Sequence, residues 1–389
     1  MATLTLATLV PLKFAEDWGR TFNEINFATT LTKLSRFEGR DLSEMHKDER
    51  YRDLIQNVPL VITSSRLRAF GDGALYAARV MLALAKLNEP RAFTDMVNEQ
   101  AKYLVETGEP LEIANLARSF ATMGVEAPAL FEEIEIQALS IMTEVPQTKK
   151  RCSNVAKAAQ LFADAGYVPA EFFDCLEKGR EKFLKRADLR SLCEVCRSIA
   201  ILGLSGKNEA LLQALWKQAM ETNVKRFRTE DLELLLCVAA HARGGGVQLR
   251  SVPEDLEKRM AYAGKGCGVR LVREEREWGG NREEYFNLLM EMGFEGERGV
   301  VFYEGMAMGF GCRANKIAVE VGGGGGLVGP RKATRRLLEH MGWKVLGVGE
   351  DDIKMLDNAP REKVEKAGGG RELKVAYLRS LLKKVGVML

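Results

Sequence analysis

The sequence is poor in several features that mark common classes of protein. No run of residues approaches the roughly 20 uninterrupted apolar residues of a membrane-spanning helix, so we expect no membrane partner. The formal net charge is only +3, and the chain contains only 3 histidines. So small a basic excess does not by itself indicate nucleic acid, and any basic surface must therefore be local.

Cysteine is scarce, and its pattern supports neither a disulfide framework nor a metal site. Seven cysteines in a chain of this length favour a reducing compartment. Cys193 and Cys196 form a CxxC pair, which is half of a common zinc site. No second CxxC follows, and the three-residue spacing also fits one apolar helical face. We therefore expect buried thiols and no metal.

Catalytic motifs are lacking as well. His46, His241 and His340 lie far apart in the sequence, and no motif argues for a Ser–His–Asp or Cys–His arrangement. Gly329 is followed by Pro330 and Arg rather than by Lys and Ser or Thr, which excludes a Walker loop. We expect a protein that is not an enzyme and that holds no cofactor.

What the sequence does contain is a repeated helical pattern between residues 20 and 250. One phrase recurs: an apolar residue, a small residue, two further positions, and then glycine or asparagine. The closing residues are 36, 42 and 37 positions apart. The phrase occurs at Leu84-Ala85 to Asn88, Phe120-Ala121 to Gly124, Phe162-Ala163 to Gly166 and Ile199-Ala200 to Gly203, with a degraded last copy in DLELLLCVAAHARGGG.

This phrase predicts the end of a helix, because glycine and asparagine accept the left-handed conformation found there. A second amphipathic helix follows each phrase, so each unit is a helical hairpin that must stack on the next one. We therefore predict an α-solenoid of helical-hairpin repeats over residues 1–243. The alternative is an irregular all-α domain, which stays open because the spacing between closing residues varies from 36 to 42 positions.

Basic clusters recur at a broadly similar interval before these closing residues. Stacked repeats would bring the clusters onto one surface that binds phosphates, whereas the simpler interpretation is a set of solvated helix starts. The clusters are Arg66/Arg68, Lys149/Lys150/Arg151, Lys185/Arg186 and Lys225/Arg226/Arg228.

The amino-acid composition of the chain changes at about residue 243. Residues 244–281 are rich in glycine and charge, and we interpret them as a linker or a loosely packed connection. Residues 282–389 read as helix, strand, strand, a further strand, helix, strand, an acidic turn and a last helix, which predicts a small α/β domain.

The end of the chain resembles the RAP domain, a small α/β module of organellar RNA-binding proteins. The resemblance is carried by IAVEV at Ile317–Val321, by Gly329-Pro330, by the basic helix and strand RKATRRLLEHMGWKVLGV, and by Lys374, Tyr377 and Leu378. In such proteins the upstream region is commonly an array similar to octotricopeptide or FAST-kinase-type repeats. The resemblance thus implies RNA binding and a fold similar to that of PD-(D/E)xK nucleases.

Those nucleases hold a divalent metal with a carboxylate on one strand and Glu-x-Lys on the next. Here Glu320 matches the Glu, but Gly322 stands where the lysine would be, and Gly305 stands where the acid of the preceding strand would be. Glu304 is expected to point to the opposite face of its strand. One carboxylate without a lysine makes a poor metal site, so we expect no nuclease activity.

A competing motif is Gly324-x-Gly326-x-x-Gly329, a formal dinucleotide-binding fingerprint between a strand and a helix. Its glycines belong to a homopolymeric run, and Pro330 removes one backbone N–H that would face a pyrophosphate. Only about 40 residues follow the next strand, too few for a doubly wound sheet. These points count against a dinucleotide site, and an oxidoreductase is kept only as the second candidate function.

The sequence thus predicts a scaffold that binds organellar RNA, most specifically ribosomal RNA of the mitochondrial ribosome, beside neighbouring proteins of a ribonucleoprotein. An RNA maturation or stability factor is the close alternative. Residues 1–15 lack acids and are rich in Thr and Ala, like the start of a mitochondrial presequence, so a matrix location is expected. The expected RNA-binding residues are Arg331, Lys332, Arg335, Arg336, Lys149, Lys150, Arg151, Lys185, Arg186, Lys225, Arg226 and Arg228.

Overall fold

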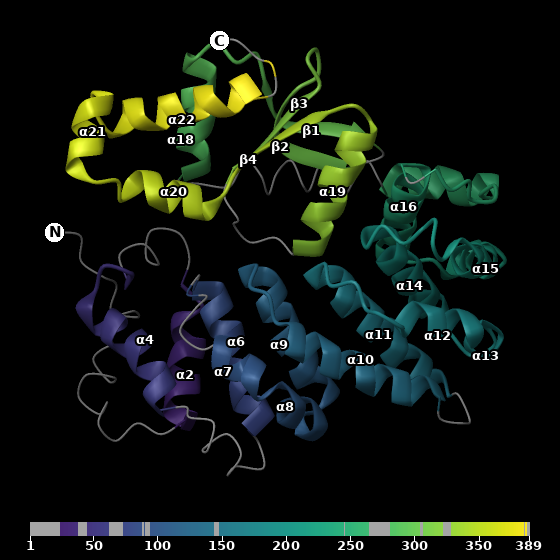
Figure 1. The fold of residues 1–389 in the computed structure, drawn as a ribbon. Helices are drawn as coiled ribbons and strands as arrows, with labels where there is room; N and C mark the ends of the chain where they lie inside the picture. Colours follow the sequence, from purple (N-terminus) through teal and green to yellow (C-terminus); the bar gives the residue numbers. More distant parts are fainter. Residues whose placement is uncertain are drawn as a thin grey trace. The chain divides into compact units, whose positions relative to one another are not determined.

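The computed structural model is mostly helical and carries a small sheet near its C-terminus (Figure 1). Its contacts divide the chain into two compact units, one of residues 1–198 with 327–330 and the other of residues 199–326 with 331–389. Among the described residues, no helix combines the length and the apolar character needed to cross a membrane. The structure describes residues 24–37, 45–61, 73–87, 89, 94–143, 148–244, 246–263, 281–303, 306–321, 328–384 and 386.

The first unit consists of helices that pack in two rows. In one row α2 packs on α6, α6 on α9, and α9 on α11, while in the other α10 packs on α7, α8 and α12. Helix α10 also packs on α11 and so joins the rows. The helices are α2 (Glu24–Leu34), α4 (Glu49–Val61), α6 (Gly73–Leu87), α7 (Thr94–Glu99), α8 (Ala101–Thr107), α9 (Pro110–Met123), α10 (Pro128–Thr143), α11 (Lys149–Ala165), α12 (Phe172–Lys178), α13 (Arg180–Leu184) and most of α14 (Leu189–Ile201).

The recurring phrase ends helices as predicted. Gly124, Gly166 and Gly203 have φ angles of 69°, 67° and 74°. In each copy, the carbonyl of the apolar residue accepts a hydrogen bond from the N–H of the residue that follows the closing position, as in a Schellman motif. These bonds are Glu89 N to Leu84 O at 3.0 Å, Val125 N to Phe120 O at 3.2 Å, Tyr167 N to Phe162 O at 3.0 Å, Leu204 N to Ile199 O at 2.9 Å and, in the degraded copy, Val247 N to Ala242 O at 2.8 Å.

Two glycines of the second unit allow a test of these helix ends. Gly246 has a φ of 75°, Gly206 does not have a positive φ, and a Cβ added to either would meet nothing within 4 Å. Gly246→Ala should therefore lower the free energy of unfolding by about 1 kcal/mol through backbone strain alone. Gly206→Ala should leave it unchanged or raise it slightly. Equal midpoints of urea unfolding for the two variants would contradict this explanation.

Side chains of one hairpin also cap helices of the next. The amide oxygen of Asn98 in α7 accepts from the N–H of Leu130 in the first turn of α10. The carboxylate of Glu135 in α10 accepts from backbone N–H groups at the start of α12. These bonds join residues 32 to 37 positions apart, which is close to the spacing of the phrase.

The second unit begins with helices and continues into the α/β region. The helices are the end of α14, α15 (Glu209–Met220), the 3-10 helix η2 (Val224–Arg226), α16 (Thr229–Gly244) and a helix over residues 254–263. This last helix lies in the stretch that we predicted as a linker, and its Leu256 and Met260 are buried. Trp216 and Gln213 of α15 hold the segment before it, by donating to the carbonyls of Arg250 and Gln248.

The predicted order of the C-terminal elements is confirmed as far as β4, including the strand at Met306, but two helices that were not predicted, α20 and α21, precede the last one. The elements are α18 (Asn281–Glu291), β1 (Glu297–Tyr303), β2 (Met306–Cys312), β3 (Ile317–Val321), α19 (Val328–His340), β4 (Lys344–Val348), α20 (Glu350–Asp357), α21 (Arg361–Ala367) and α22 (Gly370–Lys384). The expected acidic turn after β4 was wrong, because it is the helix α20. Its acids suit a helix N-terminus, where the Asp352 carboxylate accepts from Gly349 N–H.

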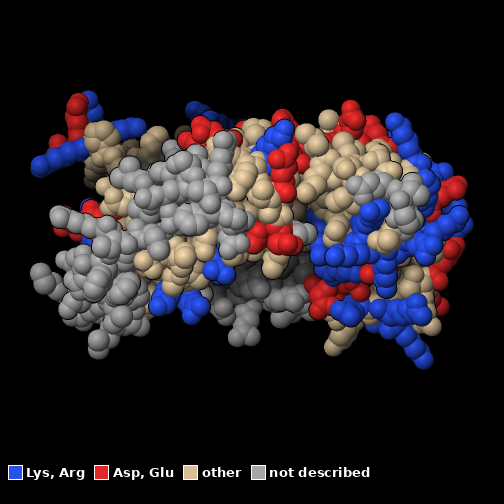
Figure 2. Space-filling view, turned by 90° about the horizontal axis from the view of Figure 1, so that it is seen from below, with Lys and Arg blue, Asp and Glu red and all other residues tan. Residues whose placement is uncertain are grey.

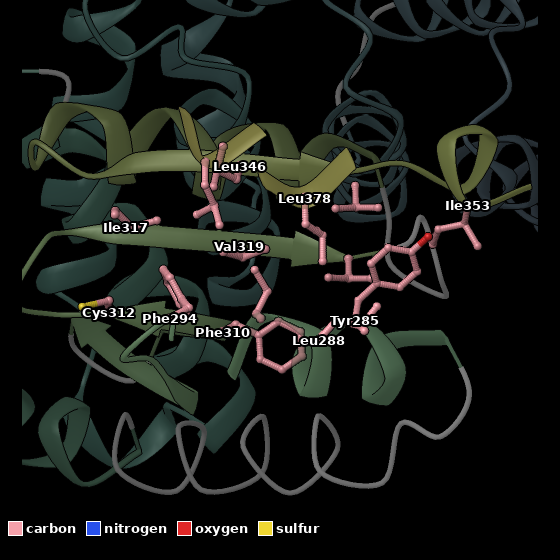
Figure 3. Packing of buried hydrophobic residues seen from close by; sticks show 14 of the residues in the cluster. Tyr285, Leu288, Phe294, Phe310, Cys312, Ile317, Val319, Leu346, Ile353 and Leu378 are labelled. Carbon is pink, nitrogen blue, oxygen red and sulfur yellow. The ribbon is translucent and has the colours of Figure 1, made fainter. Parts of the chain in front are cut away.

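The sheet has the order β1-β2-β3-β4, with β3 and β4 parallel and the other pairs antiparallel. Alternation along β3 separates its two faces. Ile317 and Val319 pack with α18, α20 and α22, and Figure 3 shows these side chains directed toward one another. Ala318 packs with Leu338 of α19 on the other face. The side chain of Glu320 lies on that second face by the same alternation.

Candidate nucleic-acid interface

The first turn of α11 carries three consecutive cations. Lys149 and Lys150 are exposed and Arg151 is half-exposed, while the hydroxyl of Thr148 caps the helix by accepting from Arg151 N–H at 3.3 Å. The helix dipole disfavours cations at this end and favours anions. A phosphate placed here would meet backbone N–H groups and cations together.

A second basic pair lies beside this turn. Lys185 and Arg186 are exposed and stand between α13 and α14. The thiol of Cys152 in α11 donates to the carbonyl of Phe183 at 4.0 Å, so the two segments are in contact. We call Lys149, Lys150, Arg151, Lys185 and Arg186 the α11–α14 cluster.

Asp188, two residues after Arg186, is an acid beside this cluster that serves to cap α14. Its carboxylate accepts from the N–H and the hydroxyl of Ser191 at 2.9 and 2.7 Å. Burial opposes ionisation, but the bonds from Ser191 and the charge of Lys149 outweigh it and hold the pKa of Asp188 below its ordinary value. The carboxylate therefore stays ionised and directed at the helix end, and it only partly offsets the cluster.

The sequence interpretation missed three further cations that extend this surface. Lys178 and Lys182 are exposed and Arg180 is half-exposed, and all three belong to or flank the short helices α12 and α13. They line a shallow hollow with Glu177 and Glu181. Figure 2 shows Lys and Arg side chains gathered, with acids among them, at the end of the molecule that holds α11 to α13. The signal in the sequence was the density of basic residues in KGREKFLKR, residues 178–186.

The third cluster belongs to the second unit. Lys225, Arg226 and Arg228 are exposed and lie before α16, which begins at Thr229, whereas Lys149 to Arg151 lie inside the first turn of α11. The expectation that all the clusters share one surface stays a prediction. Arg66 and Arg68 lie outside the described residues.

The four cations of α19 do not form the outward face that we expected. Arg336 is half-buried and donates to the carbonyl of Ile201 within the second unit, and burial lowers the pKa of its guanidinium. Arg335 pairs with Glu339 at 3.0 Å. Of the four, Lys332 and Arg335 are exposed and Arg331 and Arg336 are half-buried. Helical periodicity predicts that these four cations share one face of α19, but it cannot show that Arg336 packs inside the second unit.

The side chain of Glu320 lies on the sheet face that α19 covers, the face to which Ala318 also belongs. Burial raises the pKa of this carboxyl, and the charges of Arg335 and Arg331 act against that shift. No group of three or more His, Cys, Asp or Glu side chains among the described residues could hold a metal ion. Glu304, Gly305, Gly322, Gly324 and Gly326 lie outside the described residues.

Other residues singled out in the sequence are structural in the described chain. Cys193 and Cys196 are fully buried, as predicted, and burial raises the pKa of the Cys196 thiol. Lys374 of α22 pairs with Glu284 of α18 at 2.8 Å and with Asp357 of α20 at 2.7 Å. Lys374 thus has a structural role, because its ion pairs connect α22 with α18 and α20.

No model of a known protein family matches the chain. A search of curated proteins gives no match either.

Proposed function

We propose that this protein binds RNA without cleaving it, through the α11–α14 cluster, as a scaffold in an organellar ribonucleoprotein. The observation that carries the proposal is the contact between the start of α11 and the 183–188 segment. This contact brings the first helical turns of α11, which carry three cations, against the segment that carries Lys185 and Arg186 at the end of α13, although the chain as a whole is nearly neutral. Phosphates are the anions that best match such a local basic surface.

The arrangement of helices supports a solenoid of hairpin repeats as the scaffold for this surface. Two rows of helices, five Schellman ends and caps between hairpins recur at nearly the same interval. Repeats that contact only their neighbours present equivalent positions along one surface.

The element order of the C-terminal region supports a RAP-type domain, and the upstream helices fit the arrays that such proteins carry. On that basis we propose a component of the mitochondrial ribosome that contacts ribosomal RNA and neighbouring proteins. An RNA maturation factor is the alternative. Sequencing the RNA that co-purifies with the tagged protein separates the two, because a ribosomal component should be enriched in ribosomal RNA and a maturation factor in other transcripts.

The interface is tested by replacing all five residues of the α11–α14 cluster with glutamine in the full chain. Affinity for a labelled 30-nucleotide single strand should fall about 10-fold or more in low salt. The slope of log K against log[salt] should flatten by up to about 0.7 per lost phosphate contact. Fluorescence anisotropy at several KCl concentrations measures both quantities.

A matched control removes the same number of positive charges elsewhere. Exposed lysines at positions 33, 86, 102, 217 and 383 serve this purpose, and their replacement should have the smaller effect on affinity and slope. Equal losses in the two variants would show that only net charge matters. Unchanged binding by the cluster variant, with its circular dichroism intact, would remove the site.

A further inference from the structure

The loop before α16 is held rigidly while its cations point outward. We call Lys225, Arg226, Phe227 and Arg228 the 225–228 loop. Phe227 is buried, and its carbonyl accepts from the Arg259 guanidinium at 2.8 Å. The side chains of Asn223 and Asp231 accept from the N–H groups of Lys225 and Arg228. The three cations of the loop therefore project from a fixed backbone.

The helix that contacts this loop through Arg259 also carries an exposed aromatic side chain. Tyr262 is 81% exposed, on the helix over residues 254–263. It lies three positions after Arg259 and four after Lys258, so the three side chains share one helical face. Arg259 reaches the 225–228 loop, and Tyr262 lies three residues, a rise of roughly 4.5 Å, farther along the helix.

The packing of the core does not account for so exposed a ring at this position. The ring contributes little to the core, whereas a planar aromatic group beside cations is the arrangement that binds single-stranded nucleic acid. Cations hold the phosphates, and the ring stacks on an unpaired base. A base inside a duplex is already stacked and does not offer its face.

We propose that Tyr262 stacks on an unpaired base of RNA whose backbone is held by the 225–228 loop, so that this site selects single strands. The inference rests on the proposed RNA binding and adds the class of RNA and a second contact. The expected ligand is a single strand, because the cations of the loop can bind its phosphates while the exposed ring stacks on one of its bases.

The test compares variants of the full chain on a 12-nucleotide single strand and on a 12-base-pair RNA duplex. Tyr262→Ala should weaken single-strand binding about 10-fold, which is the lower range for loss of one stacked base. The slope with salt should not change, because no phosphate contact is lost. Duplex binding should stay as in the wild type.

Two further variants at the same position separate stacking from general apolar contact. Tyr262→Phe should bind like the wild type, and Tyr262→Ile should bind like Tyr262→Ala. Wild-type affinity in Tyr262→Ile would overturn stacking, as would equal losses on the single strand and the duplex.

The failure of this inference is distinct from failure of the proposed function. If Tyr262→Ala binds the single strand normally while Lys225→Gln/Arg226→Gln/Arg228→Gln binds weakly, RNA binding stands and the stacking contact is overturned. If the wild type binds neither RNA, both proposals are overturned.

Discussion

Replacing Trp216 by alanine should lower the free energy of unfolding of the second unit by about 4 kcal/mol. Trp216 is the largest of the fully buried side chains, with 1% of its surface exposed. Alanine leaves a cavity and also removes the indole donor from the carbonyl of Arg250, which holds the segment that leads to the helix over residues 254–263. Thermal unfolding followed by circular dichroism should show an early transition.

Trp216→Phe is the matched variant, because it keeps most of the buried ring and removes only the donor. It should cost clearly less than alanine, although the carbonyl of Arg250 loses its partner. Hydrogen exchange should report faster opening of residues 246–263 in Trp216→Ala than in Trp216→Phe. Identical exchange in both variants and the wild type would show that Trp216 does not hold this segment.

Glu135→Ala should lower the free energy of unfolding of the first unit by about 3 kcal/mol. The carboxylate is 6% exposed and accepts from three backbone N–H groups, those of Ala170 at 3.1 Å, Glu171 at 2.7 Å and Phe172 at 3.0 Å. Alanine leaves these donors without their acceptor at the start of α12, and each unsatisfied buried group costs about 1–3 kcal/mol. The expected loss is smaller than the sum of three such costs, because Ala170 and Glu171 are exposed and water can reach their N–H groups.

Glu132→Ala provides the control on the same helix, since Glu132 is exposed. It should change the free energy of unfolding by no more than about 0.5 kcal/mol. The midpoint of urea unfolding measures both variants. A Glu135→Ala protein as stable as Glu132→Ala would mean that water replaces the carboxylate at little cost.

The helix ends could be predicted because they depend on local conformational chemistry. Gly166 is needed where the backbone turns left-handed, and the apolar residue four positions before it supplies the acceptor for the closing bond. The stretch Ile317–Val321 was likewise predicted as a strand, and the structure shows that both faces of this strand are covered. The acidic stretch after β4 was misread, since acids suit a turn and a helix start equally well.

The candidate site was only partly accessible from the sequence. Lys149 and Arg186 were found as basic positions, but their proximity depends on how α11 packs against the 183–188 segment. Arg336 was assigned to the same kind of surface, and the structure instead directs its guanidinium at the carbonyl of Ile201. Both outcomes depend on contacts between residues distant in sequence, which a helical pattern does not contain.

The sequence by itself determined the helix ends with their closing glycines and the order of strands and helices from α18 to β4. These features follow from backbone preferences and from apolar periodicity over short stretches. Only the tertiary structure decided which cations reach solvent and which carboxylates act as caps, as with Glu135. Burial and the choice of hydrogen-bond partner are set when distant segments pack, because desolvation makes each polar group find a partner in the fold.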